Sequence, residues 1–173
     1  MKCPGCGYEN LPGADACENC GTSLMREDVP LAGTEVERSL MDDPVECLQP
    51  VRPLKVDPES SLQDAIQLMR KHGIGCVLIT DDAGRLTGIM TERDLLQKVA
   101  GQGVDLAHSN VEDFMSPAPE SSRPDHPLAY ALQRMIISDI RYLPIVDNSD
   151  RPAGIVSSRD IITYMANKFH TQE

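Results

Sequence analysis

The sequence is poor in aromatic residues, positive charge and long apolar runs. It has no tryptophan, 2 phenylalanines and 4 tyrosines among 173 residues, so aliphatic residues and methionine must fill its core. Its 16 Lys and Arg stand against 27 Asp and Glu, a formal net charge of -11. This acidity argues against general binding to nucleic acid or anionic membranes, which requires clustered positive charge. The sequence shows no apolar run as long as a membrane helix and no signal segment at its start. Both absences favour the cytoplasm.

Four of the six cysteines form two Cys-x-x-Cys pairs within the first 20 residues: Cys3, Cys6, Cys17 and Cys20. A glycine follows each pair, and glycine allows the backbone to turn with positive φ. Four thiolates in a tetrahedron suit Zn²⁺. A disulfide is disfavoured because the chain looks cytosolic. Iron is the closer alternative, since the first knuckle also resembles those of rubredoxins, but only Tyr8 could supply the aromatic shielding of an electron-transfer site. We favour zinc.

Residues 1–24 resemble the short zinc ribbons at the ends of many bacterial and archaeal proteins. So short a segment cannot fold by apolar burial alone, and metal binding must supply its folding energy. The ribbon is itself acidic, which favours a protein contact or a structural role over nucleic acid. Residues 25–43 are polar and are expected to form a linker. Within it, residues 34–37 have the form of a capping box that begins one short helix.

Residues 45–100 and 111–166 are the same unit written twice, 66 positions apart and without a gap. Of the 56 aligned positions 17 are identical, against about 3 for unrelated segments of ordinary composition. Two copies of one supersecondary unit can bury their apolar faces together and leave paired clefts. The function is therefore expected to depend on a pair of equivalent sites.

Each repeat predicts the order strand, helix, strand, strand, helix, an α+β unit. The helix face recurs as Leu62, Ala65, Ile66 and Met69, then as Leu128, Ala131, Leu132 and Met135. The expected strands are residues 54–56, 76–80 and 86–90 in the first copy and 120–122, 142–146 and 152–156 in the second. The last helix should begin at Thr91 or Ser157, and Gly73 should end the first helix.

Gly88-Ile-Met-Thr-Glu-Arg-Asp94 and Gly154-Ile-Val-Ser-Ser-Arg-Asp160 resemble the last strand and helix of the cystathionine-β-synthase (CBS) domain. Residues 140–147 resemble its middle strand and residues 111–115 its first segment. The resemblance covers about residues 44–167, with repeats at 44–106 and 107–173. It implies a pseudo-twofold pair with two clefts. Such pairs commonly bind adenosine nucleotides (AMP, ADP, ATP) or S-adenosylmethionine, form dimers and regulate another protein.

Thr91 and Asp94, like Ser157 and Asp160, lie three residues apart at a helix start, with hydroxyl and carboxylate on one face. A carboxylate can accept from two ribose hydroxyls, and the helix start favours phosphate. The same pattern can also be a helix cap without a ligand. The further candidates for the ligand site are Arg141, Tyr142 and Arg159. Repeat 1 has Gly75-Cys76 where repeat 2 has Arg141-Tyr142, so the two clefts are unequal.

The residues contain no pattern that argues for catalysis. We therefore expect a non-enzymatic regulator that senses an adenosine nucleotide, with the zinc ribbon as a contact for a protein partner, and a homodimer. Two alternatives stay open. One is a nucleic-acid-associated regulator that reads through the ribbon, and the other is a structural dimerisation module with empty clefts.

Overall fold

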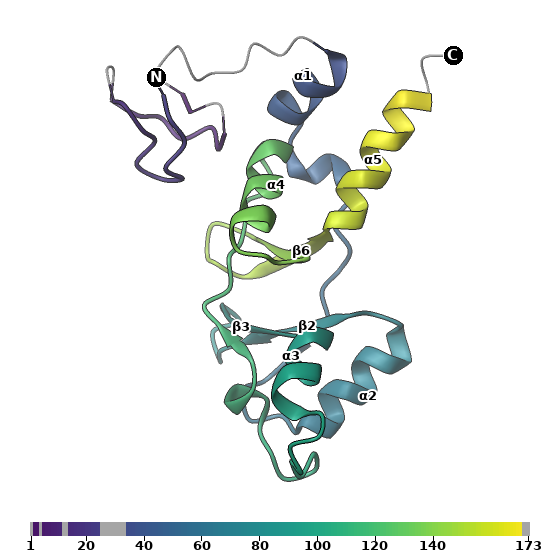
Figure 1. The fold of residues 1–173 in the computed structure, drawn as a ribbon. Helices are drawn as coiled ribbons and strands as arrows, with labels where there is room; N and C mark the ends of the chain where they lie inside the picture. The colour runs from purple at the N-terminus through teal and green to yellow at the C-terminus, as the bar shows by residue number, and fades with distance from the viewer. Residues whose placement is uncertain (1, 4, 12–13, 25–33, 171–173) are drawn as a thin grey trace. The chain divides into compact units, whose positions relative to one another are not determined.

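The structure is a computed structural model that describes residues 2–3, 5–11, 14–24 and 34–170. It has the predicted α+β class, and the chain divides into two compact units (Figure 1). Unit 1 comprises residues 1–50, 122–143 and 156–173, and unit 2 comprises residues 51–121 and 144–155. Each unit therefore contains segments of both repeats. Within the described residues, no helix has both the length and the apolar character needed to cross a membrane.

A four-stranded sheet in the order β1-β2-β3-β4 forms the centre of unit 2. Its strands are β1 (Lys55–Val56), β2 (Cys76–Thr80), β3 (Leu86–Thr91) and β4 (Ser116–Pro117). β1 runs parallel to β2, and the other neighbours are antiparallel. Every residue of β2 is buried, as expected of an apolar run at the centre of a sheet.

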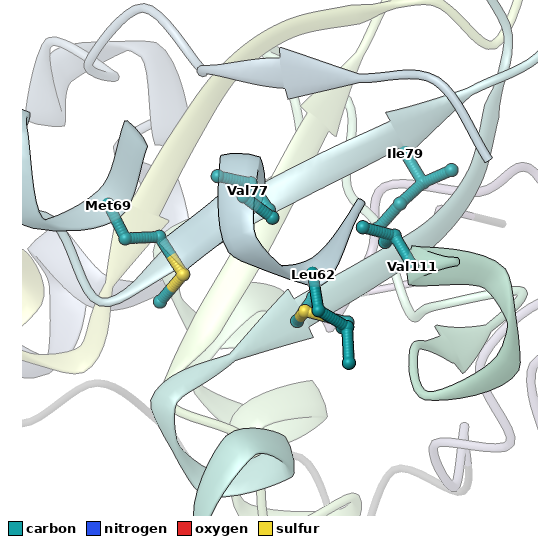
Figure 2. Packing of buried hydrophobic residues seen from close by; sticks show 7 residues of the cluster. Leu62, Met69, Val77, Ile79 and Val111 are labelled. Atoms are coloured by element: carbon teal, nitrogen blue, oxygen red, sulfur yellow. The ribbon is translucent and has the colours of Figure 1, made fainter. Parts of the chain in front are cut away.

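Helix α2 (Leu62–His72) packs its apolar face onto this sheet. Ser61 caps its start by accepting from the Asp64 N–H. Gly73 ends the helix, as predicted, and does so in the left-handed conformation at φ 64°. Figure 2 shows the core beneath the helix. Its buried members are Leu62, Ala65, Met69, Val77, Ile79, Met90 and Val111. Beyond β3 the chain forms α3 (Glu92–Asp94) and a π-helical turn, η2 (Leu95–Val99).

Unit 1 is built on three helices in mutual contact: α1 (Glu35–Asp42), α4 (Leu128–Ile137) and α5 (Ser158–His170). The capping box that opens α1 is present, with Thr34 and Glu37 each bonded to the other's backbone N–H. At the other end of α1, Asp43 accepts from Tyr164 and Lys168 of α5, at 2.5 and 2.6 Å. Strands β5 (Tyr142–Val146) and β6 (Pro152–Ser157) pair with each other, and residues 144–146 and 152–155 of this pair belong to unit 2.

The leading segments of the two repeats are exchanged. The short helix η1 (Val45–Leu48) begins repeat 1, yet its Val45 N–H donates to His126 O at 2.8 Å in repeat 2. Its counterpart η3 (Val111–Asp113) begins repeat 2, yet its Val111 N–H donates to Ser60 O at 2.9 Å in repeat 1. Both valines are fully buried. Val111 thereby joins the core beneath α2 of repeat 1, and the η1 segment that carries Val45 contacts α5 of repeat 2.

One expected strand was wrong. The sequence suggested an extended piece at 120–122, but β4 lies at Ser116–Pro117, and of 120–122 only Ser122 forms a bridge. β4 follows β3 for two residues, with Ile89 opposite Ser116 and Gly88 opposite Pro117. Ala118 then takes φ 45°, and Pro119 has no N–H to continue a ladder. These two residues explain why the strand ends there.

Candidate functional site

The four-cysteine cluster is present in the ribbon. The four sulfur atoms of Cys3, Cys6, Cys17 and Cys20 all lie within 4.8 Å of one another. Each knuckle turns through a glycine, since Gly7 and Gly21 both have φ 72° and donate to the carbonyls of Cys3 and Cys17. All four cysteines are free.

The spacing of the sulfur atoms fits a tetrahedral metal. Sγ of Cys3 lies 3.6 Å from that of Cys20, and Sγ of Cys6 lies 3.5 Å from that of Cys17. Four sulfurs at about 2.3 Å from a zinc ion stand about 3.8 Å apart, whereas a disulfide needs about 2.05 Å. Asn10, which the sequence analysis missed, is buried and lies 3.5 Å from Sγ of Cys17 through its Nδ2 donor. The cluster thus provides the charge, the spacing and the supporting donors of a metal site.

The pKa values of two of the thiols, Cys6 and Cys17, shift in opposite directions. Burial is the main cause that raises the pKa of Cys6 to about 12. Burial also acts to raise the pKa of Cys17, but hydrogen bonds from the Cys20 backbone and the Asn10 side chain outweigh it and bring that pKa to about 6. A bound cation would favour the thiolate form of all four residues.

In repeat 2 the candidate residues gather at the start of α5. The Ser158 N–H donates to the carbonyl of Arg141 at 3.0 Å, so the segment before β5 lies against the start of the helix. Oδ2 of Asp160 accepts from the N–H and the hydroxyl of Ser157, at 2.6 and 2.7 Å. This is the geometry of a helix cap, which was the alternative interpretation of the sequence pattern. Among the described residues, Oδ1 of Asp160 has no polar partner, and Asp160 is half-exposed.

Positive charge is available at the same place. The side chains of Arg141 and Arg159 are exposed, and neither guanidinium contacts a polar group within the part of the chain that the structure describes. Tyr142 is half-buried at the first position of β5. The start of α5 therefore has one open carboxylate oxygen and a helix N-terminus, and the exposed Arg141 and Arg159 belong to the two segments that meet there.

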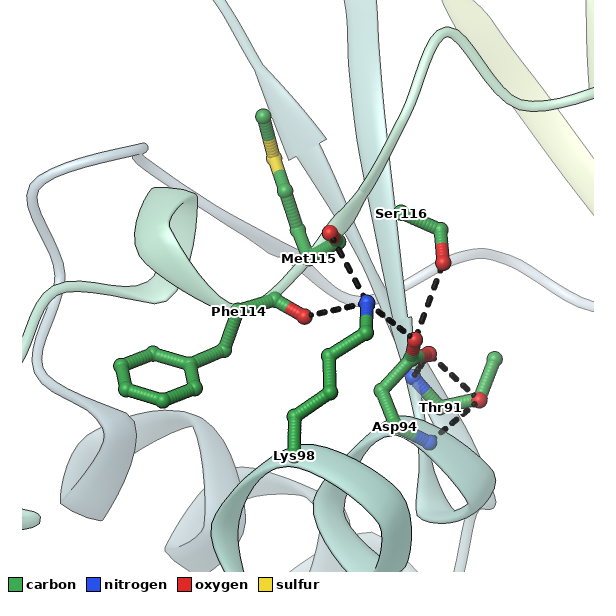
Figure 3. Close-up of polar contacts among 6 residues, drawn as sticks. All are labelled: Thr91, Asp94, Lys98, Phe114, Met115 and Ser116. Carbon is green, nitrogen blue, oxygen red and sulfur yellow. Dashed lines mark hydrogen bonds and ion pairs between the residues drawn. The ribbon is translucent and has the colours of Figure 1, made fainter. Parts of the chain in front are cut away.

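In repeat 1 the equivalent carboxylate is fully engaged (Figure 3). Oδ2 of Asp94 accepts from the N–H and hydroxyl of Thr91, at 2.9 and 2.6 Å. Its Oδ1 accepts from the Ser116 hydroxyl at 2.9 Å and forms an ion pair with Lys98 at 2.7 Å. A carboxylate has about four lone-pair sites, and Asp94 uses all of them. Asp94 is also buried, with 7% of its surface exposed.

Two sequence differences explain this asymmetry. At the 66-residue offset, Lys98 corresponds to Tyr164 and Ser116 corresponds to Pro50. Tyr164 donates to Asp43 instead, and proline has no donor. Lys98 also donates to the carbonyls of Phe114 and Met115 at 2.8 and 3.1 Å. Although burial raises the pKa of Asp94, the hydrogen bonds from Lys98 and Thr91 outweigh it, and the pKa lies below its ordinary value of 3.8.

Lys98 and Ser116 were not predicted, because they lie outside the repeated Thr/Ser-x-x-Asp pattern. The signal that could have found them was the comparison of the repeats at positions where they differ. The pattern itself predicted that Thr91 lies beside Asp94 and that Ser157 lies beside Asp160, with Arg141 nearby.

A family model of the CBS domain matches residues 38–101 and 111–167. The chain belongs to the CBS-domain family. The matched residues leave out the cysteine ribbon, which is an addition to the CBS pair.

Relatives agree with this assignment. The chain is 34% identical over 114 residues to the CBS domain-containing protein YhcV of Bacillus subtilis, covering 65% of this chain and 79% of that protein. It is 36% identical over 105 residues to an uncharacterized protein of Methanopyrus kandleri, covering 61% of this chain and 54% of that one. The chain thus spans only about half the length of that archaeal relative.

Among solved structures, the CBS domain pair of protein MJ0100 superposes with a TM-score of 0.65 at 26% identity, over 72% of this chain and 97% of that chain. That CBS pair was crystallised in complex with 5′-methylthioadenosine and S-adenosyl-L-methionine.

Proposed function

We propose that this chain is a non-enzymatic regulatory module that binds an adenosine ligand at the start of α5. The observation that carries the proposal is the state of Asp160. One of its oxygens caps the helix, and the other has no polar partner among the described residues. Two open lone-pair sites match the two neighbouring hydroxyl donors of a ribose. The adenosine compounds bound to the CBS pair of MJ0100 support the same ligand class.

The neighbouring groups suit the rest of such a ligand. The N–H groups at the first turn of α5 and its dipole favour an anion. The exposed Arg141 guanidinium can donate two parallel hydrogen bonds to a phosphate. Arg159 and Tyr142 flank this position and complete the proposed site. Because Asp94 is saturated by Thr91, Ser116 and Lys98, we propose one strong site for each chain, in repeat 2.

We further propose that Cys3, Cys6, Cys17 and Cys20 hold one Zn²⁺. Three of these four cysteines are buried. Four thiolates fill all the positions around a tetrahedral zinc ion and leave none for a substrate, so the site would be structural rather than catalytic. Elemental analysis of protein purified without added metal tests this proposal. One equivalent of zinc is expected, and iron or no metal would contradict it.

Calorimetric titration with AMP, ADP, ATP, S-adenosylmethionine and 5′-methylthioadenosine tests the ligand proposal. Asp160→Asn keeps an oxygen to accept from Ser157 and puts an amide donor where the open acceptor was. Asp160→Asn should therefore weaken ligand binding. Loss of a charge-assisted hydrogen bond to the ribose costs about 1.5–3 kcal/mol, or roughly ten- to more than a hundredfold in affinity. Its thermal melt should change little.

Asp94→Asn is the matched control. It places an amide donor against the Lys98 ammonium and the Ser116 hydroxyl, so it should lower the melting temperature and leave the affinity unchanged. Arg141→Met should weaken the phosphorylated ligands and spare S-adenosylmethionine and 5′-methylthioadenosine. If no ligand binds at millimolar concentration, the Ser/Thr-x-x-Asp pairs act as caps alone, and a dimerisation module with empty clefts is the better interpretation.

A further inference from the structure

The ribbon does not complete its own core. Its described residues bury little apolar surface beyond the cysteines and Leu24. Its own tyrosine, Tyr8, is 44% exposed. The aromatic residue in the ribbon core comes from helix α4, in unit 1. Tyr130 is 6% exposed and clusters with Cys3, Cys6, Cys17 and Leu24.

Polar contacts also join α4 to the second knuckle of the ribbon. The Thr22 hydroxyl lies 3.1 Å from Sγ of Cys20 and 3.4 Å from Oε1 of Gln133. Nη2 of Arg134 donates to the carbonyl of Asn19 at 3.4 Å. One threonine thus links a candidate metal ligand to the surface of α4.

Of the two equivalent helices, only α4 has the residues that contact the ribbon. At the 66-residue offset, Tyr130 and Arg134 correspond to Asp64 and Leu68 of α2. A carboxylate at the place of the buried tyrosine would be costly to desolvate, so α2 offers no equivalent surface. On α4 the ring is held from two sides: the Arg134 guanidinium lies 5.2 Å from its centroid, and the His126 ring packs edge-on at 4.5 Å.

We propose that the ribbon is a metal-dependent clamp on α4, with Tyr130 as its anchor. The inference rests on the metal site proposed above. With the metal bound, the two knuckles form one rigid surface that covers the Tyr130 face of the helix. Without it, the short ribbon loses the source of its folding energy and uncovers that face. The state of the metal site therefore sets the local stability of α4.

Hydrogen exchange of the α4 amides, followed by mass spectrometry with and without a chelator, tests the clamp. In the wild-type protein, metal removal should speed exchange across residues 130–137 by about tenfold or more, as expected for a lost cover over a helix. In Tyr130→Ala, exchange should be fast with or without metal, and a competing chelator should extract the metal sooner. Tyr8→Ala is the matched control and should behave as the wild type does.

Arg134→Leu provides a milder variant in case Tyr130→Ala does not fold, because leucine is the residue that α2 carries at the equivalent position. It should give the same changes to a smaller extent. The metal content of each sample is measured first. Absence of metal overturns the metal site itself. A bound metal whose removal leaves α4 exchange unchanged overturns the clamp alone, as does a Tyr8→Ala variant that matches Tyr130→Ala.

Discussion

Lys98→Met should destabilise the fold although Lys98 lies outside the proposed ligand site. The ammonium contacts three oxygens: Oδ1 of Asp94 and the carbonyls of Phe114 and Met115. Methionine keeps much of the side-chain volume and removes the charge. The change leaves the buried Asp94 with one donor to Oδ1, from Ser116, and two carbonyls without this donor.

The size of the effect follows from the burial of the two partners. Losing one member of a fully buried pair costs about 3–5 kcal/mol, whereas exposed pairs contribute below about 1 kcal/mol. The Asp94 side chain is 9% exposed and that of Lys98 is 38% exposed, so solvent screens one partner only. We expect about 2 kcal/mol, or a drop in melting temperature of roughly 4–8 °C for a chain of this size.

Thermal melts of Lys98→Met, Asp94→Asn and the double variant measure the coupling directly. The double variant should be less destabilised than the sum of the two single variants by about 1 kcal/mol or more. Lys71→Met, on the exposed face of α2, is the control and should change stability by less than about 0.5 kcal/mol. Additive single effects, or a Lys98→Met melt equal to that of Lys71→Met, would refute the reasoning.

The ribbon, the Asp94 carboxylate and the exposed helix faces give three further predictions. Cys3→Ser should abolish metal binding and unfold the ribbon while the repeats keep their cooperative melt, as metal analysis and calorimetry would show; simultaneous loss of the repeats would contradict it. Asp94 should make the stability of the fold fall in acid. Because its folded pKa lies below 3.8, its contribution to stability is complete above its unfolded pKa and is lost as the pH falls through the folded value. An Asp94→Asn variant with an equally steep acid transition would argue against this. Light scattering should show a dimer at micromolar concentration, since α4 and α5 expose large apolar side chains, and a monomer with and without nucleotide would count against it. The exposed side chains are Ile136, Ile137 and Ile162.

Most of the fold could be predicted from the sequence because the duplication showed each pattern twice. The four longer strands begin where the apolar runs begin, and β2 and β5 match the expected residues 76–80 and 142–146. The exchanged leading segments could not be predicted, because hydrophobic pattern shows that Val45 and Val111 are buried but not against which repeat.

The candidate site was predicted in part for a similar reason. A helix-start carboxylate can be located from spacing alone, and both caps lie where the pattern indicated. Whether its second oxygen is open depends on donors that arrive from distant segments, such as Ser116 from β4. The role of Tyr130 could not be predicted, since nothing in the local sequence of α4 points to a contact with the ribbon.

The exchange of Val45 and Val111 also has a consequence for how such a chain can be divided. Either repeat expressed alone would lack the valine that fills its core and would carry an apolar arm with no place to bind. Two copies of the same half could satisfy each other by trading these arms, as in a domain swap. Because both halves lie in one chain, equivalent positions can carry different residues: Lys98 pairs with Asp94, whereas Tyr164 donates to Asp43.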